Sequence, residues 1–290
     1  MNTKIKWLRE KMRGLDMQGM IVSNPVNIRY LTGINAEGVL LITRKENHYI
    51  TDSRYIEDVH STVTIDDEII ISNFTDISPY DYENFFSFCE NVGFEENYIT
   101  YAQYKKYMQK YKVNNFEETE NMIEKQRVIK DEEEIAKIQK ACELTDSCFK
   151  HLQDFIKIGM TEKEIAYEIE NYFLRNGADG LAFETIVASG KNSSKPHAIT
   201  TEKQIEKGDP ITIDFGCKYQ GYCSDMTRTV FAGHVPDRMK PIYDLVLKDQ
   251  LQTLEDMKEG AIIRNLSRNV ENDFKLYGHS LVHSLGHGVG

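Results

Sequence analysis

Residues 211–230 read ITIDFGCKYQGYCSDMTRTV, and they carry the most structural information in this chain. On both sides of Gln220-Gly221, apolar and polar residues alternate as they do in strands with one buried face. A glycine adopts the positive φ that a tight turn demands. The stretch therefore predicts a β-hairpin whose loop consists of Gln220 and Gly221.

Two aspartates share one face of this hairpin if its loop has two residues. Asp214 then faces Thr227, and Gly216 faces Asp225. The aspartates become diagonal neighbours, about 7–8 Å apart at their Cα atoms. Two carboxylates this close raise each other's pKa unless a cation compensates them, and divalent metals that prefer oxygen ligands are the usual compensators. The pattern favours a metal site.

Two alternatives remain open for these aspartates. Each could lie solvated at a turn or a strand end, without any partner. A loop of three residues would reverse the parity of one strand and place Asp214 and Asp225 on opposite faces.

Histidines cluster in residues 279–290, which read HSLVHSLGHGVG. Imidazole is a frequent metal ligand, and mixed histidine and carboxylate sites suit Mn, Co, Zn or Fe. His283 and His287 have the spacing of one helix face, but the glycines around His287 argue against a helix. His197 lies in a polar loop, residues 188–200. Taken singly, each histidine is more often an ordinary surface or core residue.

Composition excludes several classes of function. The 290 residues suffice for two domains, and 35 basic against 46 acidic residues give a net charge of −11, which argues against a nucleic-acid-binding face. The amphipathic N-terminus does not resemble a signal peptide, and no apolar run approaches the roughly 20 residues of a membrane span. Five cysteines without a Cys-x-x-Cys pair predict a reduced, cytoplasmic protein.

The first part of the chain alternates helices and strands. Apolar residues at helical spacing predict a first helix that ends at Gly19, and a short strand then leads to Asn24-Pro25, where the fixed φ of proline favours a turn. The remaining predictions for this part are a hairpin formed by residues 39–43 and 48–51 and helices within the aromatic stretch 81–112.

The second domain is predicted to begin at residue 125. Acidic residues from Asp131 open a long helix, because negative charge at a helix start is favoured, and its predicted apolar stripe runs from Ile135 to Ile156. Thr161 and Glu164 form a capping box for the next helix. From Phe183 onward the sequence predicts strands and loops.

Five motifs of this chain resemble, in order, those of the creatinase/aminopeptidase P/prolidase group of metallopeptidases, family M24. They are Asn24-Pro25 through Gly33, Phe183 through Gly190 with Pro196-His197, Asp214-Phe-Gly216, Ser224-Asp225 through Thr229, and Gly286-His287-Gly288-Val-Gly290. The resemblance covers essentially the whole chain. It implies an α/β fold with a creatinase-like N-terminal domain, residues 1–124, and a "pita-bread" catalytic domain, residues 125–290.

The resemblance also implies a function and a cofactor. In this group two divalent metals, commonly Mn²⁺ (Co²⁺, Zn²⁺ or Fe²⁺ as alternatives), activate water to hydrolyse an Xaa-Pro bond. By resemblance, Asp214 is a ligand of one metal, Asp225 bridges both, and His287 binds the second. His197 and His283 match the histidines that bind substrate or stabilise the transition state. The implied partners are a peptide with proline at its second position and a second copy of the chain; neither nucleic acid nor membrane is expected.

One departure from the family qualifies this expectation. Two glutamate ligands and a further histidine follow the Gly-His-Gly motif in the family, whereas this sequence ends at Gly290. We therefore expect a truncated chain that is itself inactive, with activity in its full-length parent. Two alternatives are a non-catalytic peptide- or protein-binding member of the same fold and a creatinase-like amidinohydrolase. The sequence does not separate an aminopeptidase from a dipeptidase.

Overall fold

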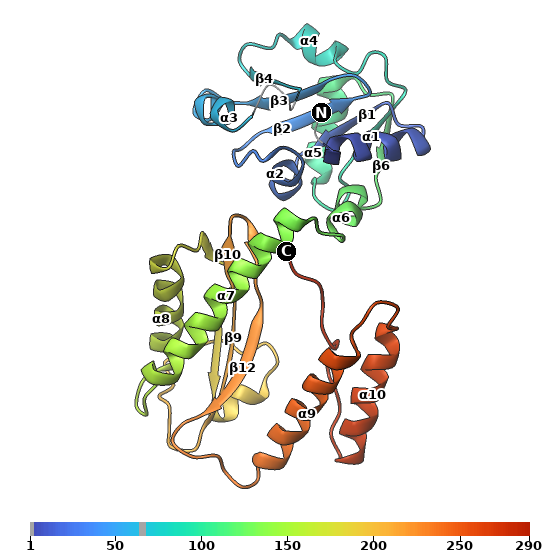
Figure 1. Cartoon of the computed structure of the whole chain (residues 1–290). Helices are drawn as coiled ribbons and strands as arrows, with labels where there is room; N and C mark the ends of the chain where they lie inside the picture. The colour runs from blue at the N-terminus through green and yellow to red at the C-terminus, as the bar shows by residue number, and fades with distance from the viewer. Residues whose placement is uncertain (1–2, 64–67) are drawn as a thin grey trace. The chain divides into compact units, whose positions relative to one another are not determined.

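The computed structural model describes residues 3–63 and 68–290, and the chain forms two compact units (Figure 1). The first unit ends at Ile129 and the second begins at Lys130. Helix α6 (Met122–Arg127) precedes this division and spans the predicted boundary between residues 124 and 125. Each unit is described here by itself.

A mixed sheet with helices forms the first unit. Its strands are β1 (Gly19–Val22), β2 (Val39–Thr43), β3 (Asn47–Thr51), β4 (Ile69–Asn73), β5 (Asn91–Phe94) and β6 (Asn115–Glu118), in the order β4-β3-β2-β1-β5-β6. The predicted β2–β3 hairpin is antiparallel, as is β1–β2, while β3–β4, β1–β5 and β5–β6 are parallel. The helices are α1 (Thr3–Gly14), α2 (Pro25–Thr32), α3 (Ile56–Thr62), α4 (Pro79–Asn84), α5 (Tyr101–Tyr111) and α6.

The core of this unit lies on both faces of the sheet. Met20 and Val22 belong to one buried cluster and Ile21 to another, because successive side chains of a strand point to opposite faces. Leu40 and Leu41 divide between the same two clusters. A sheet covered on both faces explains why these strands read as continuous apolar runs.

Two predictions for this unit were wrong, and a third was incomplete. Asn24-Pro25 begins a helix instead of a turn: the Asn24 side chain accepts from the backbone N–H of Val26, and proline occupies the first turn, where its missing N–H costs nothing. Helix α1 ends at Gly14 rather than Gly19. The stretch 81–112 contains the predicted helices, which are α4 and α5, and also strand β5, which the sequence did not predict.

The second unit places two helices against short strands. These elements are α7 (Glu132–Phe155), α8 (Glu162–Arg175), β7 (Gly180–Leu181), β8 (Ile186–Ser189), the 3₁₀ helix η2 (Gly190–Ser194), β9 (Pro210–Phe215), β10 (Cys217–Tyr219), β11 (Tyr222–Cys223) and β12 (Met226–Phe231). The strand orders are β12-β9-β8 and β11-β10-β7. Side chains of α7, α8 and the strands form one buried cluster that includes Ile169, Phe173, Ile213 and Phe215.

Both predicted helix starts in this unit are confirmed. Asp131 and Glu134 close a capping box at α7, and Thr161 and Glu164 close one at α8. The predicted stripe of α7 was partly wrong, because Ile135 is 55% exposed. The buried face of α7 instead consists of Glu134, Ala141, Leu144, Thr145, Cys148 and Leu152.

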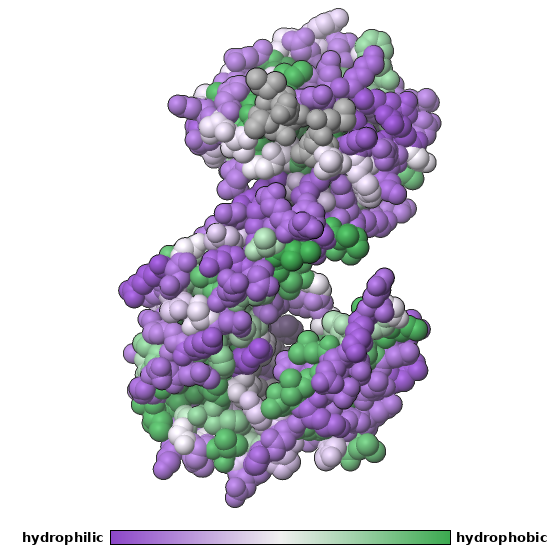
Figure 2. Space-filling model, viewed as in Figure 1, coloured by the Kyte–Doolittle hydropathy of each residue, from purple (hydrophilic) through white to green (hydrophobic). Residues whose placement is uncertain are grey.

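Two helices, α9 (Lys240–Asp256) and α10 (Ile263–Leu276), lie where the sequence predicted strands and loops. They contact each other (Figure 1), and hydrophobic residues gather on the surface over α9 (Figure 2). The exposed apolar residues of α9 are Ile242, Tyr243, Val246, Leu247, Leu251 and Leu254. In the part of the chain that the structure describes, no helix combines the length and the apolar character needed to cross a membrane.

Candidate metal centre

The hairpin of residues 211–230 has the predicted two-residue loop. Tyr219 pairs with Tyr222, and further along Asp214 pairs with Thr227. Gln220 and Gly221 both have positive φ, 46° and 82°, as a type I′ turn requires. This register excludes the three-residue loop and places Asp214 and Asp225 on one face.

Gly216 allows the two strands to approach each other at this point. A Cβ at Gly216 would lie 2.1 Å from the carbonyl oxygen of Ser224, which is a backbone atom and cannot turn aside. The position of the Ser224 backbone, and with it that of Asp225, therefore requires glycine at residue 216.

The two aspartates differ in their surroundings. The hydroxyl of Thr227 donates to Oδ1 of Asp214 at 2.7 Å and orients that carboxylate. Burial and the nearby charge of Asp214 raise the pKa of Asp225, and His287 opposes this rise. The aspartates thus form a region of concentrated negative charge in which a cation would be stabilised.

His287 meets this carboxylate pair from an irregular segment. Its Nε2 lies 3.3 Å from Oδ2 of Asp225, and its Nδ1 lies 2.9 Å from the carbonyl oxygen of Gly288. A carbonyl oxygen only accepts, so Nδ1 carries a proton. Nε2 forms an ion pair with Asp225 when the ring is protonated, and it is the nitrogen free to bind a metal when the ring is neutral. The side chain is 70% exposed, which leaves it open to a ligand.

His197 and His283 lie outside this contact. His197 is exposed in the loop after η2, and His283 is exposed with its Nδ1 2.7 Å from the carbonyl oxygen of Ser284. Neither histidine forms a hydrogen bond or ion pair with Asp214 or Asp225 in the described part of the chain.

These donors fit a divalent metal in their chemistry but do not form a closed site. Two carboxylates and one imidazole are suitable ligands for Mn²⁺, Co²⁺, Zn²⁺ or Fe²⁺. Across residues 3–63 and 68–290, however, no group of three or more His, Cys, Asp or Glu side chains has the spacing to hold a metal ion. The structure brings together Asp214 with Asp225 and Asp225 with His287, as pairs.

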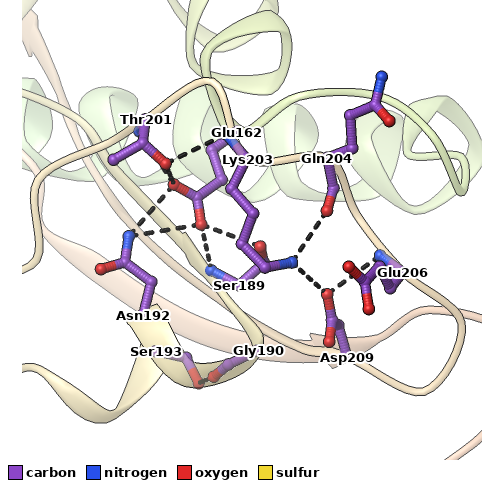
Figure 3. Close-up of polar contacts among 10 residues, drawn as sticks. All are labelled: Glu162, Ser189, Gly190, Asn192, Ser193, Thr201, Lys203, Gln204, Glu206 and Asp209. Atoms are coloured by element: carbon purple, nitrogen blue, oxygen red, sulfur yellow. Dashed lines mark hydrogen bonds and ion pairs between the residues drawn. The ribbon is translucent and has the colours of Figure 1, made fainter.

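Glu162 is a buried acid that the sequence did not single out. It is the first residue of α8, it is fully buried, and it accepts hydrogen bonds from Ser189, Asn192 and Thr201 (Figure 3). In the sequence it resembled any acid at a helix start, where the dipole alone accounts for it. The residues that bind it lie 27 to 39 positions away, so no local signal could have found them.

Comparison with known proteins agrees with this architecture. Residues 136–290 match metallopeptidase family M24, and residues 4–129 match the creatinase/prolidase N-terminal domain. The chain is 35% identical to an uncharacterized peptidase, YqhT, of Bacillus subtilis, over 99% of this chain and 82% of that protein. It is 32% identical to an Xaa-Pro dipeptidase of Pyrococcus horikoshii, over 100% of this chain and 82% of that protein.

Solved structures show the same fold. An Xaa-Pro dipeptidase from Bacillus anthracis superposes with a TM-score of 0.93 at 32% identity, covering 99% of this chain and 81% of that one. The prolidase from Pyrococcus horikoshii gives a TM-score of 0.89 at 31% identity, over 100% and 82% of the two chains. These matches confirm the predicted α/β fold and the resemblance seen in the motifs: the chain belongs to metallopeptidase family M24, with a creatinase/prolidase N-terminal domain before its pita-bread domain.

Proposed function

We propose that the protein carrying this chain is a metal-dependent exopeptidase that hydrolyses the Xaa-Pro bond at the N-terminus of peptides. One observation supports this most directly: the hairpin places Asp214 and Asp225 on one face, with Nε2 of His287 3.3 Å from Asp225. Membership of family M24 and similarity to Xaa-Pro dipeptidases point to the same substrate.

Asp214, Asp225 and His287 would hold the metal, which we propose is Mn²⁺ in a pair of ions. A bound divalent ion supplies an activated water at neutral pH and stabilises charge on the carbonyl oxygen of an amide. Neighbouring groups orient two of these proposed ligands through hydrogen bonds. The hydroxyl of Thr227 holds Oδ1 of Asp214, and the Gly288 carbonyl leaves Nε2 of His287 as the donor atom.

His197 and His283 are proposed to contact the peptide. Both are exposed on irregular segments, where a substrate can reach them. A neutral imidazole can donate a hydrogen bond to a carbonyl oxygen and accept one from an amine, so either histidine can orient a peptide through its polar groups.

Two finer predictions accompany this function. We propose a cytoplasmic location, which is supported by the five cysteines, all free thiols, as expected in a reducing compartment. A homodimer also remains a prediction.

Proline release tests the proposal. The product of the complete gene should release proline from a dipeptide with proline second when Mn²⁺ is present, and a chelator should stop this release. Asp225→Asn should lower kcat/KM by about a hundredfold or more, since it removes a charged ligand. Asp237→Asn, at an exposed position outside the site, is the matched control and should change nothing.

Other outcomes would contradict the assignment. Proline release that survives chelation or Asp225→Asn would exclude the metal mechanism. Tight binding of Xaa-Pro peptides without turnover would indicate the peptide-binding alternative, and chelator-resistant hydrolysis of an amidino compound would indicate the amidinohydrolase. Cleavage of tripeptides as well as dipeptides would distinguish an aminopeptidase from a dipeptidase.

A further inference from the structure

The loop that carries His197 is held at both ends by one carboxylate. This loop, residues 190–200, follows β8 and ends beside Thr201 (Figure 3). Ser189, immediately before the loop, and Thr201, immediately after it, both donate hydrogen bonds to Glu162.

Each oxygen of Glu162 serves one end of the loop. Oε1 accepts from the backbone N–H of Ser189 at 2.6 Å and from its hydroxyl at 2.9 Å. Oε2 accepts from the backbone N–H of Thr201 at 2.9 Å and from its hydroxyl at 2.7 Å. Inside the loop, Nδ2 of Asn192 lies 3.2 Å from Oε2 and donates to the carbonyl oxygen of Ile199 at 3.0 Å. The carboxylate therefore joins the start, the middle and the end of the loop.

Glu162 is itself anchored to a rigid element. Thr161 and Glu164 cap α8, so the helix start does not depend on the side chain of Glu162. The backbone N–H of Glu162 donates to the carbonyl oxygen of Lys203, and that of Lys163 donates to the carbonyl oxygen of Thr201. Further along the same face of α8, Ile165, Ile169 and Phe173 are fully buried in the core. A helix start alone would need none of the loop contacts that surround Glu162.

The C-terminal end of the loop contacts strand β8, which pairs with the strand that contains Asp214. The hydroxyl of Thr200 accepts from the backbone N–H of Val187 at 2.9 Å and lies 3.2 Å from the carbonyl oxygen of Thr185. These residues flank Ile186, which pairs with Asp214. His197 precedes Thr200 by three positions, so it lies close along the chain to a residue that is held against the strand next to that of Asp214.

We propose that Glu162 is a positioning residue for the loop 190–200. It thereby holds the segment that carries His197 against strand β8, which pairs with the strand of Asp214. The catalytic part of this inference rests on the proposed function, because it takes His197 as a substrate-contacting residue. The loop-holding part rests on the geometry alone.

A carboxylate is required here because every neighbour is a donor. An ionised glutamate accepts only, whereas the amide of glutamine would turn one acceptor into a donor aimed at Ser189 or Thr201. Burial by itself would raise the pKa of Glu162, but the hydrogen bonds from Thr201 and Ser189 outweigh it and lower that pKa. The side chain is thus ionised at neutral pH.

Hydrogen exchange followed by mass spectrometry tests the loop-holding part on the 290-residue chain. Glu162→Gln should speed exchange of amides 190–201 by at least about tenfold, with β9 little changed, because it removes charge-assisted hydrogen bonds that close the loop. Glu164→Gln is the matched control: it changes a neighbouring acid of the same helix, and glutamine also closes a capping box. Loop exchange in Glu162→Gln equal to that of the wild type would overturn the proposal.

A second pair of variants decides the question if Glu162→Gln does not fold. Thr201→Val removes one donor to Glu162 at nearly constant volume, while Thr201→Ser retains the hydroxyl. Faster loop exchange in Thr201→Val, with the wild-type rate in Thr201→Ser, supports the proposal. Wild-type rates in both variants overturn it.

Kinetics of the complete gene product test the catalytic part. Glu162→Gln should lower kcat for proline release by about tenfold or more and change KM and Mn²⁺ affinity much less, because it misplaces a group without removing a ligand. A wild type without Mn²⁺-dependent proline release would refute the proposed function and leave the exchange result to decide the role of Glu162. An active wild type whose Glu162→Gln variant keeps the same kcat would refute the positioning of His197 alone.

Discussion

Two acids in the second unit show how surroundings set the charge of a carboxyl group. Asp225 is partly buried near the carboxylate of Asp214, and burial together with this negative charge raises its pKa. Glu162 is fully buried, yet its pKa is lowered, because the hydrogen bonds from Thr201 and Ser189 stabilise the ionised form by more than burial disfavours it. A cation would stabilise the ionised form of Asp225, whereas hydrogen-bond donors of the chain itself stabilise the ionised form of Glu162.

Glu162 should make the stability of the protein depend on acid pH. Its folded pKa lies below its unfolded value, so its stabilisation is fully present above the unfolded pKa, 4.5, and is lost as pH falls through the folded pKa. Glu162→Gln should therefore reduce the free energy of unfolding by about 1.5–3 kcal/mol at pH 7, and by less as the pH falls below about 4.5. Urea unfolding of both proteins over this pH range provides the measurement.

Glu255→Gln serves as the control for this pH series, because Glu255 is an exposed glutamate of α9. It should follow the wild type at every pH. A difference between wild type and Glu162→Gln that stays constant down to pH 4 would mean that the charge of Glu162 contributes nothing.

At the scale of elements, the hairpin β9–β12 depends on close backbone approach and on its turn. The pairing of Asp214 with Thr227 follows from the two-residue loop, and Gly216 lets the strands come together beside Ser224. The placement of Asp214 and Asp225 on one face is thus a property of the hairpin, and His287 meets Asp225 from a distant segment.

Gly216→Ala should damage both stability and metal binding. The added Cβ would lie 2.1 Å from the carbonyl oxygen of Ser224, so one strand must move and carry Asp225 with it. We expect a loss of about 2–3 kcal/mol in the free energy of unfolding, typical of overpacking, and a weaker response of Tm to Mn²⁺.

Gly14→Ala is the matched control for this substitution. Nothing lies within 4 Å of a Cβ at Gly14, which ends α1, so alanine there should be neutral or slightly stabilising. Equal stability of the Gly216→Ala and Gly14→Ala proteins in urea unfolding would contradict the steric argument.

At the scale of the whole molecule, each compact unit has its own core. Buried clusters on the two sheet faces stabilise the first unit, and a separate cluster of α7, α8 and the strands stabilises the second. The proposed metal ligands all belong to the second unit.

Core truncations should therefore separate stability from metal binding. Leu41→Ala removes a fully buried side chain of the first unit and should cost about 2–5 kcal/mol, with Mn²⁺ affinity within about twofold of the wild type. Ile213→Ala, in the second unit next to Asp214, should reduce both. Calorimetric titration with Mn²⁺ and urea unfolding measure the two quantities, and a large loss of affinity in Leu41→Ala would contradict the expectation.

Local chemistry made much of this protein predictable from its sequence. The acidic start of α7, the capping box of α8, the β2–β3 hairpin and the pairing of Asp214 with Thr227 each depend on local spacing or on a short turn, whose preferences act in any context. The same local reasoning was wrong for Asn24-Pro25, because asparagine followed by proline suits a helix start as well as a turn.

The sequence by itself thus determined the strands of the hairpin and the family to which the chain belongs, while the register of the structure decided that both aspartates lie on one face. Only the tertiary structure decided that His287 reaches Asp225 and that Glu162 holds both ends of the loop bearing His197. The physical reason is distance along the chain. Contacts between residues tens of positions apart depend on how helices and strands pack, and the same local pattern is compatible with many such packings.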